Sequence, residues 1–193
     1  MKRCDLQRNG LKTKYRMEKA VLRDLIKGCL RNEKKHQKKL YKAFYGFACS
    51  IALRYASDRE EASIIMNKGF YSAFTCLGDY KEPTAFKEWL RLFIVQASIK
   101  HYLDQRQLPA LVPESETVDM DSAPINFEDG FSCSHGIKML HQLPNLSRVV
   151  FNLFVMEGYG HEKIAGLLDI TAYTSQEVLT SAREKLNNLM RVE

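Results

Sequence analysis

The chain has 193 residues, a formal net charge of +6 and 45% hydrophobic residues, so it is long enough for one large or two small domains with apolar cores. Proline and glycine are scarce, and long stretches repeat apolar residues at helical spacing, which predicts an all-α protein. No apolar run is long enough to span a bilayer, and no signal-peptide core follows the basic residues 1–5, so we expect the protein to remain cytoplasmic.

The cysteines predict no disulfide framework. They are odd in number, widely separated and mostly placed on apolar helix faces, a pattern typical of reduced core thiols: Cys4, Cys29, Cys49, Cys76 and Cys133. Cys133 and His135 with His141 make a poor metal pattern, and His161 lacks the second histidine of a zinc-protease helix because Ala165 stands there. No glycine-rich phosphate loop or nucleophile elbow occurs. We therefore expect no enzyme, no metal, no cofactor and no small-molecule substrate.

Charge is distributed unevenly along the chain. Residues 1–106 carry 23 lysines and arginines against 11 acids, residues 107–130 carry six acids and no base, and residues 131–193 carry six of each. The densest group of bases lies on one predicted helix: Lys34, Lys35, Lys38, Lys39 and Lys42. A solvated surface is the ordinary explanation for such lysines. The size of the asymmetry nevertheless favours a polyanionic partner for the first half.

A linker is predicted at residues 107–133. This segment contains Pro109 and Pro113, has no helical period and is acidic. About 25 residues without regular structure are unusual inside a compact domain, so we expect a flexible acidic linker between two small helical domains. The predicted domains span residues 18–106 and 134–193.

The first domain is predicted to contain four helices. They cover residues 18–30, 33–56, 58–77 and a segment from Phe86 to Tyr102. Asp58 and Glu61 form a capping box at the start of the third helix. Between the third and fourth helices lies a loop whose aromatic neighbours, Tyr80, Phe86 and Trp89, are more often core residues. Beside basic residues they could also stack on unpaired bases.

The second domain is predicted to end in a helix-turn-helix. A short helix at residues 158–168 is followed by a turn at 169–173, and Thr174 with Glu177 predicts a capping box for the last helix. Tyr173 and Val178 occupy the positions of a hydrophobic staple. The outer face of the last helix is predicted to carry Ser175, Gln176, Thr180, Ser181 and Arg183. Such a helix could enter a DNA major groove, although an ordinary helical hairpin has the same pattern.

Several segments resemble sigma factors of bacterial RNA polymerase, of the extracytoplasmic-function (ECF) group of the sigma-70 family. Residues 25–30 and 53–62 resemble the start of the family's first domain, and residues 86–91 its melting helix. Residues 140–144, 148–153 and 157–159 resemble the entry to its second domain, and residues 174–186 include positions that resemble its recognition helix. These pieces occur in the family's order across an acidic linker. The resemblance covers about residues 20–106 and 137–190.

The resemblance implies a function and its partners. The first domain, like sigma region 2, would grip a coiled coil of the β′ subunit of the RNA polymerase core, capture a flipped base of the −10 promoter element and hold the melted strand. The second domain, like sigma region 4, would place its recognition helix in the major groove of the −35 element. Family members also have membrane-tethered anti-sigma proteins as partners.

The resemblance also assigns residues by position. The residues that would bind the polymerase core lie on the third helix: Ile64, Asn67, Lys68 and Tyr71. The residues that would bind the −10 element lie in the following loop and at the start of the fourth helix: Asp79, Tyr80, Lys81, Phe86 and Trp89. The residues that would bind the −35 element lie on the last helix: Ser175, Gln176, Thr180, Ser181 and Arg183.

The chain departs from the family at some of these positions. The family usually has acids at the positions of Ile64 and Lys68, where they meet arginines of the polymerase, and bases at the positions of Gln176 and Ser181. The alternative therefore stays open that the chain is a sigma-like helix-turn-helix regulator, or a protein-binding module, that no longer directs initiation.

Overall fold

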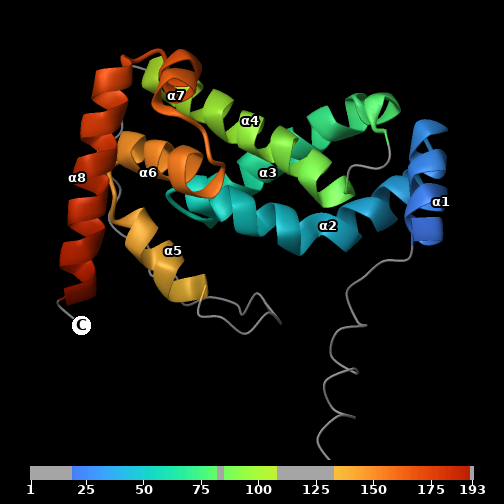
Figure 1. Cartoon of the computed structure of the whole chain (residues 1–193). Coiled ribbons are helices and arrows are strands. Elements are labelled where there is room, and N and C mark those ends of the chain that lie inside the picture. The colour runs from blue at the N-terminus through green and yellow to red at the C-terminus, as the bar shows by residue number, and fades with distance from the viewer. Residues whose placement is uncertain (1–18, 82–84, 108–132, 192–193) are drawn as a thin grey trace, which may run out of the picture.

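The computed structural model describes residues 19–81, 85–107 and 133–191, drawn in colour in Figure 1. Within these ranges the chain forms eight α-helices with short 3-10 and π-helical segments and no β-strand, which confirms the all-α prediction. None of these helices is long and apolar enough to cross a membrane. The predicted linker lies almost entirely outside the described residues.

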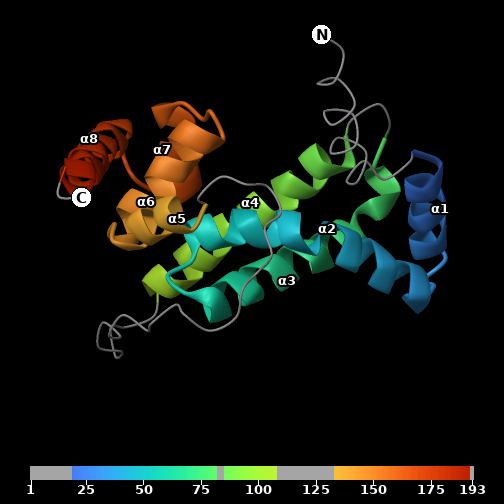
Figure 2. The same cartoon turned by 90° about the horizontal axis from the view of Figure 1, so that it is seen from below.

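Helices α1 to α4 form the first half of the molecule. They are α1 (Lys19–Leu30), α2 (Lys34–Tyr55), α3 (Arg59–Thr75) and α4 (Phe86–Gln107), with a 3-10 turn at Leu77–Asp79. In both Figure 1 and Figure 2, α2, α3 and α4 lie side by side in the middle of the molecule, and α1 lies at one end. The four predicted helices are therefore present, each within a few residues of its expected bounds.

The start of α3 follows the predicted capping chemistry with one shift. The Asp58 side chain accepts a hydrogen bond from the Glu61 backbone N–H at 2.8 Å, as an N-cap residue does. The Glu61 carboxylate, however, accepts from the backbone N–H and the hydroxyl of Ser57, one residue before the cap. The reciprocal bond of the box thus reaches back one residue further than expected.

Close approach of α3 and α4 depends on Gly69. A Cβ atom built on Gly69 would lie 2.5 Å from Ile94 Cδ1 and 3.0 Å from the Ile94 Cα. Leu90 and Ile94 on α4 and Ile65 and Met66 on α3 are almost completely buried there. The two helices pack this closely because the glycine leaves room for the backbone of its neighbour.

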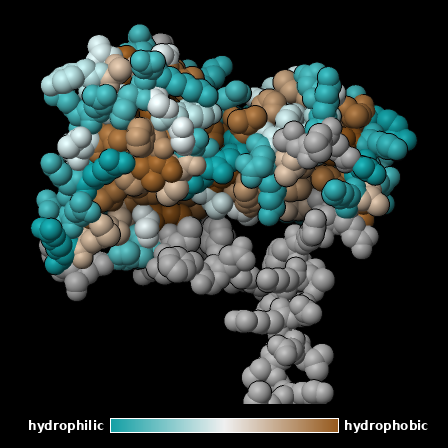
Figure 3. Space-filling model, viewed as in Figure 1, coloured by the Kyte–Doolittle hydropathy of each residue, from teal (hydrophilic) through white to brown (hydrophobic). Residues whose placement is uncertain are grey.

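Four further helices and a π-helical turn form the second half. They are α5 (Cys133–His141), α6 (Asn145–Phe151), the π-helical turn Asn152–Met156, α7 (His161–Leu168) and α8 (Ala172–Arg191). Figure 1 shows α8 at the end of the molecule opposite α1. A small apolar cluster joins α5 to α8: Leu140, Leu143, Ala182 and Leu186, with Met139, Phe151 and Leu189 packed against it. Apolar surface is visible over this region in Figure 3.

One buried core runs through both halves. Val149, Val150 and Leu153 belong to the same apolar cluster as Leu53 and Ile94. The two predicted domains therefore pack against each other in this structure. Their division at the linker stays a prediction.

The carboxyl end of α2 is capped by side chains from the second half. His141 Nε2 lies 2.9 Å from the Leu53 carbonyl oxygen, Asn152 Nδ2 donates to the Arg54 oxygen at 2.8 Å, and Arg148 Nε donates to the Tyr55 oxygen at 3.1 Å. The last carbonyls of a helix have no partner within the helix. Here three of them gain partners that lie more than 80 residues away in sequence.

Side chains of α4 in turn donate hydrogen bonds to the second half. Arg91 Nε donates to Glu157 Oε2 at 2.7 Å, and its Nη2 donates to Glu157 Oε1 at 3.2 Å and to the Met156 carbonyl oxygen at 2.7 Å. Arg106 Nη1 donates to the carbonyl oxygen of Leu168 at the end of α7, at 3.1 Å. Each half thus supplies polar side chains to a helix end or turn of the other.

Three of the cysteines are free thiols in this structure. Cys29 and Cys49 are buried free thiols, and Cys76 is a half-buried one, as predicted. Burial, with a contribution from Glu33, raises the pKa of the Cys29 thiol to about 11, so this thiol is neutral at physiological pH. Within the described ranges no three His, Cys, Asp or Glu side chains are grouped to hold a metal ion.

Candidate nucleic-acid interface

The turn between α7 and α8 is shorter than the sequence predicted. Asp169 adopts a left-handed conformation with φ 52°, and the Ile170 N–H donates to the Ala165 oxygen at 3.1 Å. Thr171 then caps α8, because its Oγ1 accepts from the Thr174 N–H at 3.0 Å. The predicted N-cap at Thr174 is therefore wrong, since the left-handed residue reverses the chain early and α8 already begins at Ala172.

The predicted hydrophobic staple is also absent. Tyr173 is 68% exposed and lies within the first turn of α8, so it does not occupy the position before the cap. Because α8 starts three residues earlier than predicted, its exposed N-terminal turn contains a tyrosine that the sequence pattern assigned to the preceding turn.

Ser175 does not lie on the outer face of α8, and that prediction is wrong. The residue is completely buried, and its Oγ lies 3.0 Å from His161 Nδ1 on α7. Its position four residues before Leu179 places it on the buried stripe that Ala182 and Leu186 continue. Ser175 therefore holds the two helices of the pair together and is not accessible to DNA in this structure.

The other residues predicted for the −35 element are exposed on α8. Gln176, Thr180 and Arg183 are separated by four and three residues, so they share one face, with Ser181 beside them. Thr180 Oγ1 donates to the Gln176 carbonyl oxygen at 3.0 Å, and the Arg183 guanidinium lies 5.5 Å from the centre of the Phe154 ring. This face of α8 is thus polar and exposed to solvent.

Tyr173 is a candidate that the sequence pattern did not indicate. It is exposed and precedes Gln176 by three residues, so it continues the same face toward the amino end of α8. Recognition helices contact base edges mainly through their first residues. The sequence signal that could have indicated Tyr173 is the pair Thr171 and Thr174. A cap at Thr171, three residues earlier than expected, places Tyr173 in the first turn of the helix.

The aromatic residues predicted for the −10 element form one cluster. The ring centres of Tyr80, Phe86 and Trp89 are 5.4 Å apart in each pair. Phe86 is buried and lies 4.7 Å from Phe44, so it belongs to the core. Tyr80 and Trp89 are half-buried and reach the surface, where Asp79 and Lys81 are exposed; the loop residues 82–84 lie outside the described ranges.

The residues predicted to bind the polymerase core share an exposed face of α3. Ile64 is 42% exposed and Tyr71 is 76% exposed, with Asn67 and Lys68 exposed between them. Asn67 accepts a hydrogen bond from the Tyr41 hydroxyl at 3.0 Å. Lys68 Nζ lies 4.0 Å from the carboxylate of Asp104 on α4. The structure therefore brings the four residues together on a surface with apolar and polar parts.

The lysine group predicted to meet a polyanion lies on the first half of α2. All of its members are exposed: Lys34, Lys35, Lys38, Lys39 and Lys42. Lysines four residues apart project from the same side of a helix. The group thus presents a positive strip next to α1.

Comparison with known proteins shows which class of protein the chain is similar to. No protein-family model matches the chain. The RNA polymerase sigma-H factor of Pseudomonas aeruginosa is 21% identical over 161 residues, which cover 73% of this chain and 79% of that protein. The solved structure of CnrH in complex with the cytosolic domain of CnrY has a TM-score of 0.45 and 17% identity, covering 90% of this chain and 99% of that chain, and this structural likeness is too low to carry weight. By sequence, the chain is therefore similar to a bacterial RNA polymerase sigma factor, the same family that its motifs resemble.

Proposed function

We propose that the chain is a sigma factor that binds the RNA polymerase core and directs it to specific promoters. The observation that carries the proposal is the exposed polar face of α8, set by a short turn against α7, in a chain similar to a sigma factor over 73% of its length. A second helix oriented by a short turn is the usual way to present side chains to a major groove.

In this proposal α8 reads the −35 element. Gln176 can pair in a bidentate manner with adenine, and Arg183 can pair with guanine or contact phosphate. The packing of Arg183 against Phe154 at 5.5 Å supports this role, because a side chain with fewer free rotamers loses less entropy on binding.

In this proposal the first half binds the polymerase core and the −10 element. Ile64 and Tyr71 on α3 leave apolar surface uncovered, which marks an interaction site when polar residues surround it. Tyr80 and Trp89 reach the surface between α3 and α4 and can stack on bases of a separated strand. An anti-sigma protein as a further partner rests on the family resemblance alone.

The decisive experiment is transcription with purified components. Promoters are first located by sequencing transcripts after forced expression of the chain. Core polymerase is then supplied with the chain and a promoter fragment, and run-off transcripts are measured with the wild type and with Gln176→Ala. We expect promoter-dependent transcripts that the substitution reduces. Transcripts that do not depend on the chain would refute the proposal.

The second candidate is a sigma-like regulator that no longer directs initiation. It is favoured by α3, where the family's carboxylates are replaced by Ile64 and Lys68, both exposed. Co-purification with the polymerase core, with and without promoter DNA, separates the two candidates. A regulator would bind DNA and leave the core unbound.

A further inference from the structure

We infer that Phe154 and His161 are positioning residues for Arg183, which they hold beside an aromatic ring so that its guanidinium meets a phosphate of duplex DNA. This inference rests on the proposed function, since it takes the exposed face of α8 as the surface that contacts DNA. It extends that surface to two residues outside α8, one in the π-helical turn and one in α7, to which the sequence pattern assigned no role in DNA binding.

The π-helical turn places Phe154 beside α8. Within this turn Asn152 and Leu153 are buried, whereas Phe154 is only half-buried. The Glu157 N–H closes the turn by donating to the Asn152 carbonyl oxygen at 3.1 Å. π-Helical turns are rare and frequently lie at functional sites. Here the turn brings one aromatic ring out of the core and into contact with a side chain of α8.

Arg183 is the side chain that meets this ring. Its guanidinium carbon lies 5.5 Å from the centre of the Phe154 ring. A cation within about 6 Å of a ring centre is attracted to the face of the ring. Among the described residues, no acidic side chain forms an ion pair with this guanidinium. The charge of Arg183 is therefore positioned by the ring and stays available to an anion that approaches α8.

His161, the first residue of α7, fixes the ring in turn. Its imidazole stacks on the Phe154 ring, with 4.6 Å between the ring centres and an interplanar angle of 25°. Its Nδ1 lies 3.0 Å from the hydroxyl of Ser175, which is completely buried in α8. A continuous series of contacts thus begins at Ser175 and returns to α8 at Arg183. Each ring in this series has a neighbour that limits its rotation.

The position of Arg183 along α8 favours a phosphate over a base edge. Recognition helices contact base edges mainly through their first residues, and here Tyr173 and Gln176 occupy that part of α8. Arg183 follows the first helical residue, Ala172, by about three turns. A guanidinium matches the oxygens of a phosphate through two parallel hydrogen bonds. We therefore assign Arg183 to the DNA backbone beside the groove that the start of α8 enters.

The ring pair, Phe154 and His161, would raise affinity without changing sequence preference. An unrestrained arginine side chain loses rotamer freedom when it binds, and a side chain that already lies against a ring loses less. Phosphate contacts carry no sequence information directly. Loss of the ring pair should therefore weaken binding to all duplexes alike.

The test measures binding of the full-length chain to a fluorescent DNA duplex that the chain itself selects from a randomised library. Phe154→Leu keeps an apolar side chain but removes the aromatic face, and it should weaken binding by roughly 2- to 30-fold. Phe154→Tyr keeps the aromatic face and should bind like the wild type. Arg183→Ala should weaken binding and lower the slope of log affinity against log salt by about 0.9, as expected for one lost phosphate contact.

A double-mutant cycle shows whether the ring pair acts through Arg183. If it does, Phe154→Leu combined with Arg183→Ala should bind the duplex like Arg183→Ala alone, and so should His161→Ala combined with Arg183→Ala. Additive losses would show that Phe154 or His161 contacts DNA directly or only supports the fold. Either result would overturn the inference.

The matched control is a second ring with a cation beside it. Phe47→Leu removes an aromatic ring of α2 whose centre lies 5.4 Å from the Lys87 ammonium, and it should leave duplex binding unchanged. Circular dichroism and thermal unfolding of every variant separate a binding defect from a folding defect. A control that is weakened as much as Phe154→Leu would overturn the inference. So would a library selected by Phe154→Leu that yields a different preferred sequence from that of the wild type.

The outcome is distinguishable from failure of the proposed function, because the duplex test needs no polymerase. If Phe154→Leu binds the duplex normally while the wild type directs transcription, only the role of the ring pair is wrong. If the wild type directs no transcription and the cycle still shows coupling between Phe154 and Arg183, the ring pair positions an arginine in a DNA-binding regulator and the sigma-factor proposal fails. A chain that selects no duplex would overturn the inference together with the assignment of α8 to DNA.

Discussion

Arg148 Nε donates a hydrogen bond to the carbonyl oxygen of Tyr55 at 3.1 Å, and both residues are buried. Burial lowers the pKa of the Arg148 guanidinium, and the carboxylates of Glu61 and Asp58 partly oppose that change. The guanidinium still carries its charge at neutral pH. A cation of α6 therefore lies at the carboxyl end of α2, where the helix dipole favours it.

Replacing Arg148 by alanine should destabilise the whole chain. The substitution leaves a buried carbonyl without its donor and removes a cation near Glu61, and a hydrogen bond to a charged group contributes about 1.5–3 kcal/mol. Urea unfolding followed by circular dichroism measures the loss. Arg183→Ala, at an exposed arginine of α8, is the control and should change stability by less than about 0.5 kcal/mol. Equal effects of the two substitutions would contradict the assigned role of Arg148.

Two glycine substitutions should act in opposite directions. Gly69→Ala places a Cβ 3.0 Å from the Ile94 Cα, so α3 and α4 must separate, at a cost of about 1–3 kcal/mol. Gly46→Ala, in the middle of α2 with no atom within 4 Å of its added Cβ, should stabilise by about 0.5–1 kcal/mol through helix propensity. Thermal unfolding midpoints report both signs. A Gly69→Ala variant as stable as the wild type would show that the helices do not pack this closely.

Acidification should weaken the contact between the two halves through His141. Burial lowers the pKa of His141 below 6.5, and Arg148 lowers it further, while the bond to Leu53 and the carboxylates of Asp58 and Glu61 oppose this. The unfolded chain therefore binds the proton more readily than the folded chain. Stability from this site is present above about pH 6.5 and is lost as the pH falls through the folded pKa.

The variant His141→Gln isolates that effect. Glutamine can still donate to the Leu53 oxygen, but it does not titrate. Urea midpoints at pH 7.5 and pH 5.5 should differ more for the wild type than for His141→Gln, while the remaining histidines contribute equally to both. An identical pH dependence in the two proteins would exclude His141 as the acid-sensitive group.

The exposed face of α8 should control promoter sequence preference. Gln176→Ala should cost about 1–3 kcal/mol of binding free energy and relax the preference at one base pair. Arg183→Ala should weaken binding to all sequences alike if the guanidinium meets phosphate. Ser175→Ala should lower stability without changing sequence preference, because Ser175 is buried against His161. Selection from a randomised promoter library by polymerase carrying each variant measures all three effects.

Restoring acids on α3 should strengthen binding to a generic polymerase core. Ile64 and Lys68 are one turn apart and exposed, and a lysine facing an arginine of the partner is repulsive, at a cost of up to several kcal/mol. We expect the double change Ile64→Asp with Lys68→Glu to bind labelled core more tightly than the natural chain. The surface ion pair of Lys68 with Asp104, at 4.0 Å, contributes little to stability and its removal should not unfold α4.

The opposite result for α3 would be equally informative. Tight binding by the natural chain that disappears when the acids are restored would show that Ile64 and Lys68 meet a surface different from the one that the family resemblance implies. Tyr71→Ala, which removes an exposed aromatic from the same face, should weaken core binding in either case.

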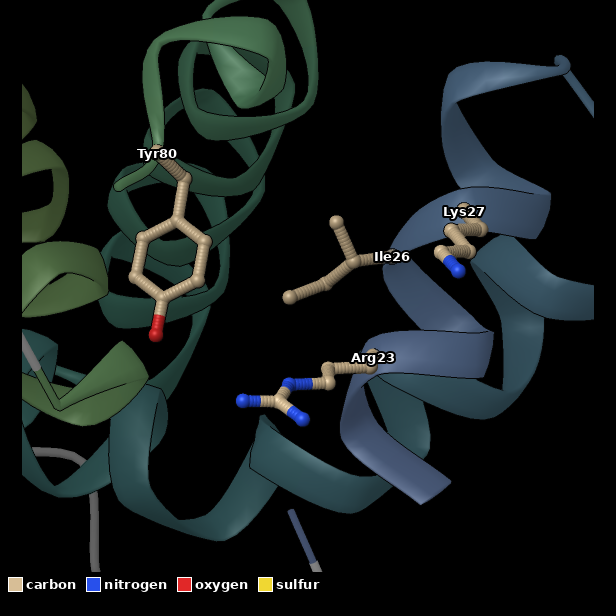
Figure 4. Close-up of a pocket in the computed structure, with 4 residues that line it drawn as sticks. All are labelled: Arg23, Ile26, Lys27 and Tyr80. Atoms are coloured by element: carbon tan, nitrogen blue, oxygen red, sulfur yellow. The ribbon is translucent and has the colours of Figure 1, made fainter. Parts of the chain in front are cut away.

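The sequence predicted helices well and contacts between distant helices poorly. The helix expected at residues 33–56 is observed at Lys34–Tyr55, because apolar spacing and helix-compatible residues act locally. The prediction for Ser175 was wrong because Ser175 lies four residues before Leu179 and therefore on the buried stripe, and the early cap at Thr171 includes it in the packed part of α8. The proximity of α1 to Tyr80 (Figure 4) could not be predicted, because no local pattern shows which segment α1 faces.

The docking of the two halves was equally hidden. Backbone carbonyls accept the bonds of His141, Asn152 and Arg148, and every residue has a carbonyl, so no sequence pattern marks the acceptors. What the sequence does contain is a set of polar residues inside apolar helices. A buried Asn152 or Arg148 requires a partner, and the sequence alone does not identify it.

The capped end of α2 has a consequence for synthesis on the ribosome. Chains are made from the amino end, so the carbonyls of Leu53, Arg54 and Tyr55 emerge about a hundred residues before the side chain of Asn152 that completes their bonding. Helices α1 to α4 are exposed to solvent with one helix end open during that interval. A message truncated after α4 would release a fragment in which that helix end is still unsatisfied.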